Sequence, residues 1–146
     1  MEFMKVAIKC AHKALIKNEV PVGAVIVRNS KIIGQGYNTV IEDGSIASHA
    51  EINAIIDASQ NIKNYRLLGC EIYTTLEPCH MCAKAIVDAR ISNLYFGALE
   101  PKTGSIVSID HFLEKSFLNH KVNYSYGYLE DDSRELLQSF FKSKRT

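Results

Sequence analysis

The sequence predicts an α/β fold in which helices cover the faces of one mixed, five-stranded sheet. Apolar residues recur with helical spacing over residues 2–17, and a nearly all-apolar run of strand length follows at 20–27. A two-residue turn then leads into a second strand at 31–37, which predicts a hairpin and one antiparallel strand pair. From residue 71 onward, strands and helices alternate, which favours crossover connections and parallel pairing.

Each predicted helix or strand follows from a local pattern in the sequence. In the first helix, lysine at every fourth position marks the solvent face, and Phe3, Ala7 and Cys10 lie on the other side. The run at 20–27 is apolar on both faces, as expected of a buried strand. A second helix begins near His49, with Ile52, Ile55 and Ile56 on one face. Three more strands are predicted at 71–76, 91–96 and 122–128. The remaining helices are one beginning at Pro78, a short one near 109–115, and a last one over 133–141.

The bulk properties suit one domain over residues 1–146, because a chain of this length buries roughly 70% of its unfolded surface. The formal net charge of +1 does not by itself indicate a nucleic-acid partner, so any basic surface must be local. No apolar run is long enough to cross a membrane. Lysines occupy the place of a signal peptide's apolar segment, so the cytoplasm is the expected compartment.

Two short motifs far apart in the chain together predict a zinc site. One is His-Ala-Glu at residues 49–51, and the other is Pro-Cys-His-Met-Cys at residues 78–82. Cys79 and Cys82 have the C-x-x-C spacing of a metal clamp, and His49 can supply a third ligand. Three protein ligands leave one tetrahedral position open, which is typical of catalytic zinc.

Other interpretations of these residues remain open at this stage. Cys79 and Cys82 could be buried thiols at coincidental spacing or a redox pair. Ser48 and Glu51 fit the S-x-x-E capping box, in which the glutamate bonds only to a backbone amide. His80 could be a fourth ligand that closes the metal site, although a residue that faces solvent or a partner is favoured.

The pattern H-x-E…P-C-x-x-C is typical of zinc-dependent nucleobase deaminases. Zinc lowers the pKa of a bound water from about 15.7 to around 7, and the resulting hydroxide can attack an amidine-type carbon. Glu51 would then take the proton of the water, deliver it to the ring nitrogen and protonate the departing amine. A purely structural zinc site has no use for this glutamate, so the spacing favours catalysis.

Beyond the zinc motif, the sequence resembles the bacterial tRNA-specific adenosine deaminases, members of the cytidine deaminase-like superfamily. The resemblance spans nearly the whole chain. It is carried by the segments Glu19-Val20-Pro21-Val22-Gly23-Ala24-Val25, Gly36-Tyr37-Asn38, Asn64-Tyr65-Arg66-Leu67, Thr75-Leu76-Glu77-Pro78-Cys79, Phe96-Gly97-Ala98, Lys102-Thr103-Gly104, Asn119-His120 and Phe140-Phe141. The resemblance implies a three-layer α/β/α fold, one zinc ion per chain and a homodimer. It also implies hydrolytic conversion of the wobble adenosine of a tRNA anticodon stem-loop to inosine, with release of ammonia.

The resemblance also implies roles for individual residues. His49, Cys79 and Cys82 would hold zinc, and Glu51 would be catalytic. Substrate contacts are implied for Val22, Asn38, Ala50, Pro78, Glu100, Asn119, Phe141 and Arg145. Glu100 departs from the family, which carries an aspartate near this position, so the contact of this carboxylate with the anticodon loop is expected to differ.

Two competing functions share parts of this pattern. A deaminase of a free base or nucleoside, of the guanine or cytosine/cytidine type, would use the same zinc chemistry. An aromatic and basic C-terminal helix argues against it, because a small-molecule pocket does not need one. A non-catalytic zinc-stabilised subunit or RNA-binding module is the other alternative, and it has no need of a proton carrier such as Glu51.

Overall fold

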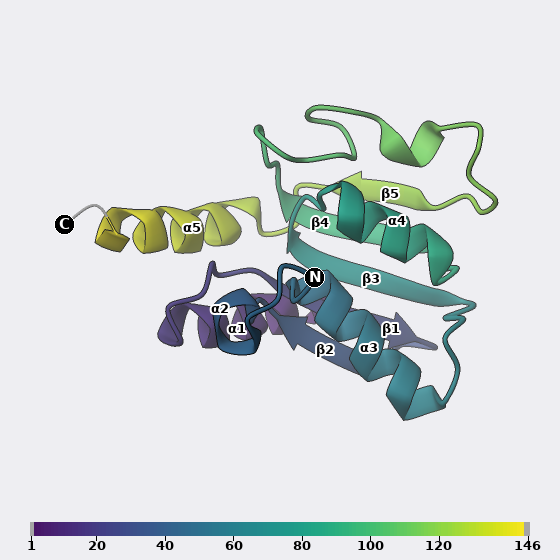
Figure 1. The fold of residues 1–146 in the computed structure, drawn as a ribbon, viewed down its shortest axis with the longest axis horizontal. Coiled ribbons are helices and arrows are strands. Elements are labelled where there is room, and N and C mark those ends of the chain that lie inside the picture. Colours follow the sequence, from purple (N-terminus) through teal and green to yellow (C-terminus); the bar gives the residue numbers. More distant parts are fainter. Residues whose placement is uncertain (1, 145–146) are drawn as a thin grey trace.

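The sheet is mixed and has the five strands that the sequence predicts, but it contains two antiparallel pairs where the sequence predicted one. The structure, a computed structural model, describes residues 2–144. The strands are β1 (Gly23–Arg28), β2 (Lys31–Tyr37), β3 (Cys70–Leu76), β4 (Asn93–Ala98) and β5 (Asn123–Tyr126). They lie in the order β2-β1-β3-β4-β5, as Figure 1 shows. β1 pairs antiparallel with β2 and β3, whereas β3–β4 and β4–β5 are parallel.

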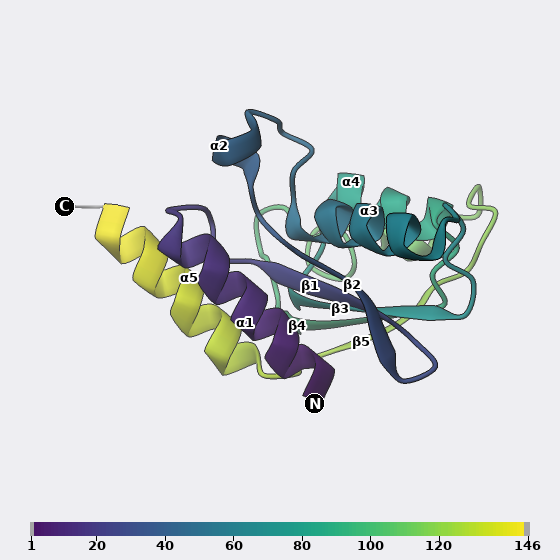
Figure 2. The same cartoon turned by 90° about the horizontal axis from the view of Figure 1, so that it is seen from below.

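Helices cover both faces of this sheet, which confirms the three-layer α/β/α arrangement. They are α1 (Glu2–Ile16), α2 (Val40–Asp43), α3 (Ala50–Ile62), α4 (His80–Asp88), the 3₁₀ turn η1 (Phe112–Glu114) and α5 (Glu130–Lys144). Figure 2 shows α3 and α4 together on one face of the sheet and α1 and α5 on the other. No helix among residues 2–144 combines the length and the apolar character needed to span a bilayer.

The interior strand β1, between β2 and β3, is apolar on both sides because a core lies on each face of the sheet. Ala24 and Ile26 belong to the core cluster beneath α3 and α4. Val25 and Val27 belong to a second cluster, which packs against α1. All four side chains are fully buried, as predicted for a strand without a solvent face.

The predicted start of this strand was wrong by three residues. β1 begins at Gly23, and the N–H of Val22 bonds instead to the carbonyl of Val20 at 2.9 Å. Pro21 has no N–H to offer a neighbouring strand, so the sheet cannot include it in a regular ladder. As a result Val20 and Val22 leave the sheet and become available to the pocket described below.

Several helix boundaries also differ from the prediction. α4 begins at His80 and not at Pro78, with Cys79 as the extended N-cap residue. α5 extends further than predicted in both directions: its acidic first turn and the lysines of its last turn both lie inside the helix, where they complement the helix dipole. The four-residue α2 was not predicted, since it is too short to produce an apolar period.

The apolar face predicted for the helix after His49 was right for Ile55, which packs against the core, and wrong for Ile56. Ile56 is 49% exposed, and the fully buried side chains of α3 include those of Ala54 and Ala58. The reason lies in β2, where a Cβ on Gly36 would collide with the backbone of α3. Glycine allows a close approach of helix and strand that small alanines fit and isoleucines do not. This contact fixes the start of α3, which carries the first zinc motif.

Candidate metal centre and active site

Three predicted metal ligands converge at the beginnings of two neighbouring helices. His49 is the N-cap residue of α3, Cys79 is the N-cap residue of α4, and Cys82 lies in the first turn of α4. The Nδ1 atom of His49 lies 3.7 Å from the Sγ of Cys79 and 3.4 Å from the Sγ of Cys82. All three candidate ligand atoms lie within 4.8 Å of one another.

The chemistry of these donors fits zinc. One imidazole and two thiolates form a donor set that zinc prefers, and three protein ligands correspond to a catalytic site. Within residues 2–144, no other group of three or more His, Cys, Asp or Glu side chains comes close enough to hold a metal. The convergence of His49 on the two thiols favours a metal site over a redox pair or two unrelated cysteines.

His80 is not part of this group, so the alternative of a fourth protein ligand is wrong. Its side chain is 51% exposed and its Nε2 lies 3.0 Å from the Oδ2 of Asp110. It turns away from the cysteines on either side because successive residues of a helix point in different directions. The three-ligand arrangement therefore keeps a position open for water or substrate.

Glu51 is buried beside the ligands, with only 4% of its surface exposed. The N-cap residue of α3 is His49, in an extended conformation, and not Ser48 as a capping box would require. The extended backbone at His49 lets His49 and Glu51 line the same cavity, although residues two apart diverge on a regular helix. The capping-box interpretation of Glu51 is therefore wrong.

The electrostatics of the cluster favour proton transfer near neutral pH. Burial raises the pKa of Glu51 to about 7, so this carboxyl can both take and release a proton. The hydrogen bond with Cys82 lowers the pKa of Cys79, and the same contact together with burial raises that of Cys82. The hydrogen bond with Cys79 also raises the pKa of His49. One thiolate is thus favoured next to the imidazole.

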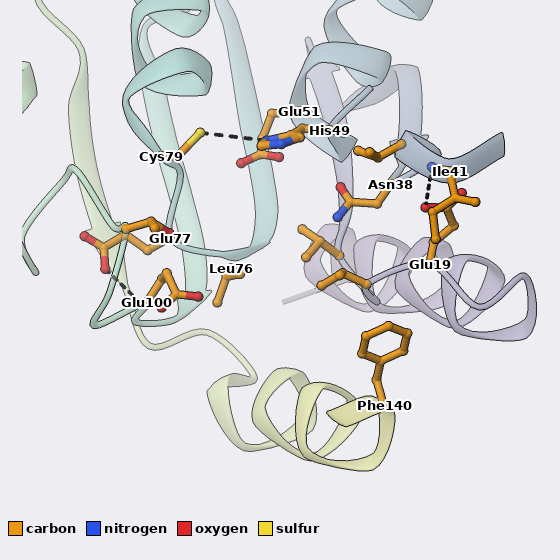
Figure 3. A pocket seen from close by; sticks show the side chains of 14 residues that line it. Glu19, Asn38, Ile41, His49, Glu51, Leu76, Glu77, Cys79, Glu100 and Phe140 are labelled. Carbon is orange, nitrogen blue, oxygen red and sulfur yellow. Dashed lines mark hydrogen bonds between the residues drawn. The ribbon is translucent and has the colours of Figure 1, made fainter. Parts of the chain in front are cut away.

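These residues lie at one side of a cavity of about 320 Å³, a size that accommodates a small-molecule group. Figure 3 shows His49, Glu51 and Cys79 at one side of the cavity and Phe140 reaching toward it from α5. The other residues that line it are Glu19, Val20, Val22, Asn38, Val40, Ile41, Leu76, Glu77, Glu100 and Thr103.

Three of the predicted substrate residues line this cavity, namely Val22, Asn38 and Glu100. The side-chain oxygen of Asn38 accepts a hydrogen bond from the N–H of Ala50 at 2.7 Å, which ties this amide to the start of α3. Ala50 and Pro78 are buried and do not line the cavity. The carbonyl of Pro78 is engaged with Ser105, whereas the N–H of Ala50 is bonded to the cavity residue Asn38.

The other predicted substrate residues lie outside the cavity. Asn119 is exposed in the loop between η1 and β5. Phe141 is 48% exposed on α5, next to the pocket residue Phe140. Arg145 lies outside the described residues. Any substrate that reaches both the cavity and these positions must therefore be larger than a single base.

Comparisons with known proteins agree with this geometry. Residues 1–98 match the family model of the cytidine and deoxycytidylate deaminase zinc-binding region, which supports zinc as the cofactor of this site. A tRNA-specific adenosine deaminase of Aquifex aeolicus is 46% identical over 143 residues, which cover 98% of this chain and 94% of the relative. The chain belongs to the tRNA-specific adenosine deaminase family.

Solved structures support the same relationship. A structure from a study of A-to-I editing by tRNA A34 deaminases has a TM-score of 0.91 and 39% identity, covering 93% of this chain and 99% of the other. A guanine deaminase of Bacillus subtilis has a TM-score of 0.65 and 29% identity, covering 85% and 82% of the two chains. The likeness to the tRNA deaminase structure is higher on every measure.

Several pocket residues were not singled out from the sequence. Glu19, Glu77 and Thr103 belong to the segments on which the resemblance to the tRNA-specific adenosine deaminases was based, so that signal could have found them. Phe140 is buried and also faces the cavity. Ile41 lies on the unpredicted α2 and carried no signal.

Proposed function

We propose that this protein hydrolyses the wobble adenosine of a tRNA anticodon to inosine and releases ammonia. The observation that carries the proposal is the buried Glu51 beside the His49, Cys79 and Cys82 donors, in a member of the tRNA-specific adenosine deaminase family. We further propose that residues 1–146 act as one domain and that the cytoplasm is its compartment.

His49, Cys79 and Cys82 would hold the zinc ion that the donor set fits. Zinc bound by three protein ligands supplies a Lewis acid that brings the pKa of water near neutrality. Glu51 takes one proton from the attacking water and delivers it to the ring nitrogen. It then takes the second proton, from the newly added hydroxyl, and passes it to the departing amino group, which leaves as ammonia. A carboxyl whose pKa lies at about 7 suits both directions of this transfer.

The cavity walls would orient the base for this reaction. Asn38, held by the N–H of Ala50, presents its remaining amide group to the cavity, where it can hydrogen-bond to a purine. Val22 offers an apolar surface on which a ring can lie. Glu100 stands on the opposite wall, where a longer side chain than the family's aspartate would meet the anticodon loop.

The alternative is a deaminase of free guanine, cytosine or cytidine. Phe140 in the cavity and exposed Phe141 beside it favour RNA, because bases splayed out of a loop stack on aromatic rings. The decisive experiment incubates the purified protein with total tRNA, free adenosine, cytidine and guanine, and sequences the RNA for inosine. Inosine at the wobble position supports the proposal, whereas preference for a free compound supports the alternative.

The C-terminal end of α5 should separate RNA from small substrates. Removing residues 141–146 is expected to leave zinc content unchanged and to lower activity on tRNA by about tenfold or more. One base–aromatic stack contributes roughly 1–3 kcal/mol, and the removed segment includes exposed Phe141 and cationic Lys142 and Lys144.

Steady-state kinetics on an anticodon stem-loop at several salt concentrations will check this prediction. Full-length activity should fall as salt rises, because contacts with phosphates release counterions. The truncated enzyme should show a shallower dependence on salt. Normal editing of tRNA by the truncated protein would contradict the role assigned to this segment.

We also propose that the active form is a homodimer, on the basis of the family. The apolar residues in and after the last turn of α4 do not offer a surface for this contact, because Ile86, Val87 and Ala89 are buried in the core of their own chain. Exposed Ile56 and Tyr65 on and after α3 offer apolar surface instead.

Sedimentation velocity at micromolar concentration should therefore give a mass near twice that of the 16.3 kDa chain. The same preparation should be assayed on an anticodon stem-loop, so that mass and activity refer to one state. A fully active monomer would exclude the homodimer.

A further inference from the structure

Glu77 is a buried carboxylate outside the metal group. It directly follows β3 and precedes the metal ligand Cys79 by two residues. Only 2% of its surface is exposed, although it lines the cavity. Burying a carboxylate is costly unless hydrogen bonds satisfy its oxygens, so its partners indicate what it does.

Within residues 2–144, the hydrogen bonds to this carboxylate come from one loop. Its Oε1 accepts the N–H of Glu100 at 3.0 Å and the hydroxyl of Ser108. Its Oε2 accepts the N–H groups of Ile106, Val107 and Ser108 at 3.1, 2.8 and 3.0 Å. A single side chain therefore gathers both ends of the loop over residues 99–109, which has no regular secondary structure.

The backbone of this loop packs closely around the Glu77 side chain. A Cβ on Gly104 would collide with the Glu77 carboxylate, so this position needs glycine. The N–H and hydroxyl of Ser105 both donate to the carbonyl of Pro78, at 2.9 and 3.0 Å. The loop thus closes around residues 77 and 78, immediately before the ligand Cys79.

The loop in turn forms part of the cavity wall. Glu100 and Thr103 both line the cavity, and Figure 3 shows Glu77 joined to Glu100 on the side opposite Glu19 and Ile41. Glu77 itself is not one of the converging metal donors. The hydrogen bonds of Glu77 therefore link the segment that carries the metal ligand Cys79 to the 99–109 loop, which faces the cavity.

We propose that Glu77 is a positioning residue for RNA, which fixes the 99–109 loop so that Glu100 and Thr103 meet the anticodon. This inference rests on the proposed function. The reaction needs the base placed accurately at the metal, and hydrogen bonds from a rigid neighbour supply that placement without contact with the reacting atoms.

Glu77→Gln tests this role, because glutamine presents one oxygen where the loop needs two. Its NH₂ group must face either the N–H of Glu100 or the three amides at 106–108. We expect KM for an anticodon stem-loop to rise by at least about tenfold with a smaller change in kcat, since charge-assisted bonds are lost. Zinc should remain at one per chain. Glu2→Gln, on the exposed start of α1, is the matched control and should match wild type.

Two further measurements separate positioning from a general loss of stability. Hydrogen exchange should quicken at the amides of residues 100 and 106–108 in Glu77→Gln, while α3 keeps its protection. Gly104→Ala should raise KM similarly by displacing the same loop. The Glu77→Gln/Gly104→Ala double variant should then be little worse than the worse single variant, as expected for residues that act through one element.

The outcomes distinguish this inference from the proposed function. If wild-type protein does not deaminate the stem-loop, the proposed function fails. If wild type is active and folded Glu77→Gln keeps both KM and loop exchange, the positioning role is wrong. Loss of zinc in Glu77→Gln would also overturn it, by showing a role at the metal. If Glu77→Gln does not fold, Ser108→Ala, which removes one donor, must raise KM for the inference to stand.

Discussion

Glu51→Gln is expected to reduce deamination by at least about 10²-fold and up to about 10⁴-fold, the range for a general acid–base residue. Glutamine has nearly the same shape and can still accept a hydrogen bond, so zinc and fold should be retained. What it cannot do is carry a proton, and Glu51 lies in the cavity with a pKa raised by burial to about 7.

Single-turnover rates on an anticodon stem-loop, together with zinc analysis, will measure this effect. Asp57→Asn is a matched carboxylate-to-amide control on α3, where Asp57 accepts the N–H of Gln35 at 2.9 Å. An asparagine oxygen can accept the same bond, so this control should keep normal activity. Near-normal activity of Glu51→Gln, or its unfolding, would point instead to a structural glutamate.

Cys82→Ala is expected to lose bound zinc and activity together. Its Sγ is one of three converging donors and lies 3.4 Å from the Nδ1 of His49. Loss of an outer partner of a metal ligand already costs about 10–100-fold in metal affinity, so loss of a direct ligand should exceed the upper figure. Activity should fall at least as far, since among the described residues only His49 and Cys79 join Cys82 in the group of converging donors.

Elemental analysis of the purified variants, with wild type at one zinc per chain, checks this assignment. Cys10→Ala is the matched control, because Cys10 is an equally buried thiol on α1, away from the metal group. It should keep full zinc and activity. Full zinc occupancy in Cys82→Ala, or equal zinc loss in Cys10→Ala, would refute the ligand set.

Several parts of the fold could be predicted from local sequence alone. β2 matches its predicted bounds at 31–37, and α1 differs from its prediction by one residue at its end. Both have a strong local signal, namely a hairpin turn and a regular lysine period. The zinc donors were also predictable, because the spacing within C-x-x-C and H-x-E is set by neighbouring residues and does not depend on the rest of the fold.

The sequence by itself therefore determined the fold class and the candidate metal donors, whereas the extended backbone at His49 decided that Glu51 lies beside them. The physical reason is that periodicity, turns and ligand spacing act over a few residues. Only the tertiary structure decided which face of α3 is buried, because that depends on Gly36 across the helix–sheet contact. The tertiary structure also decided which residues form the cavity wall, because Glu77 and the loop at 99–109 meet through hydrogen bonds between residues up to 31 positions apart.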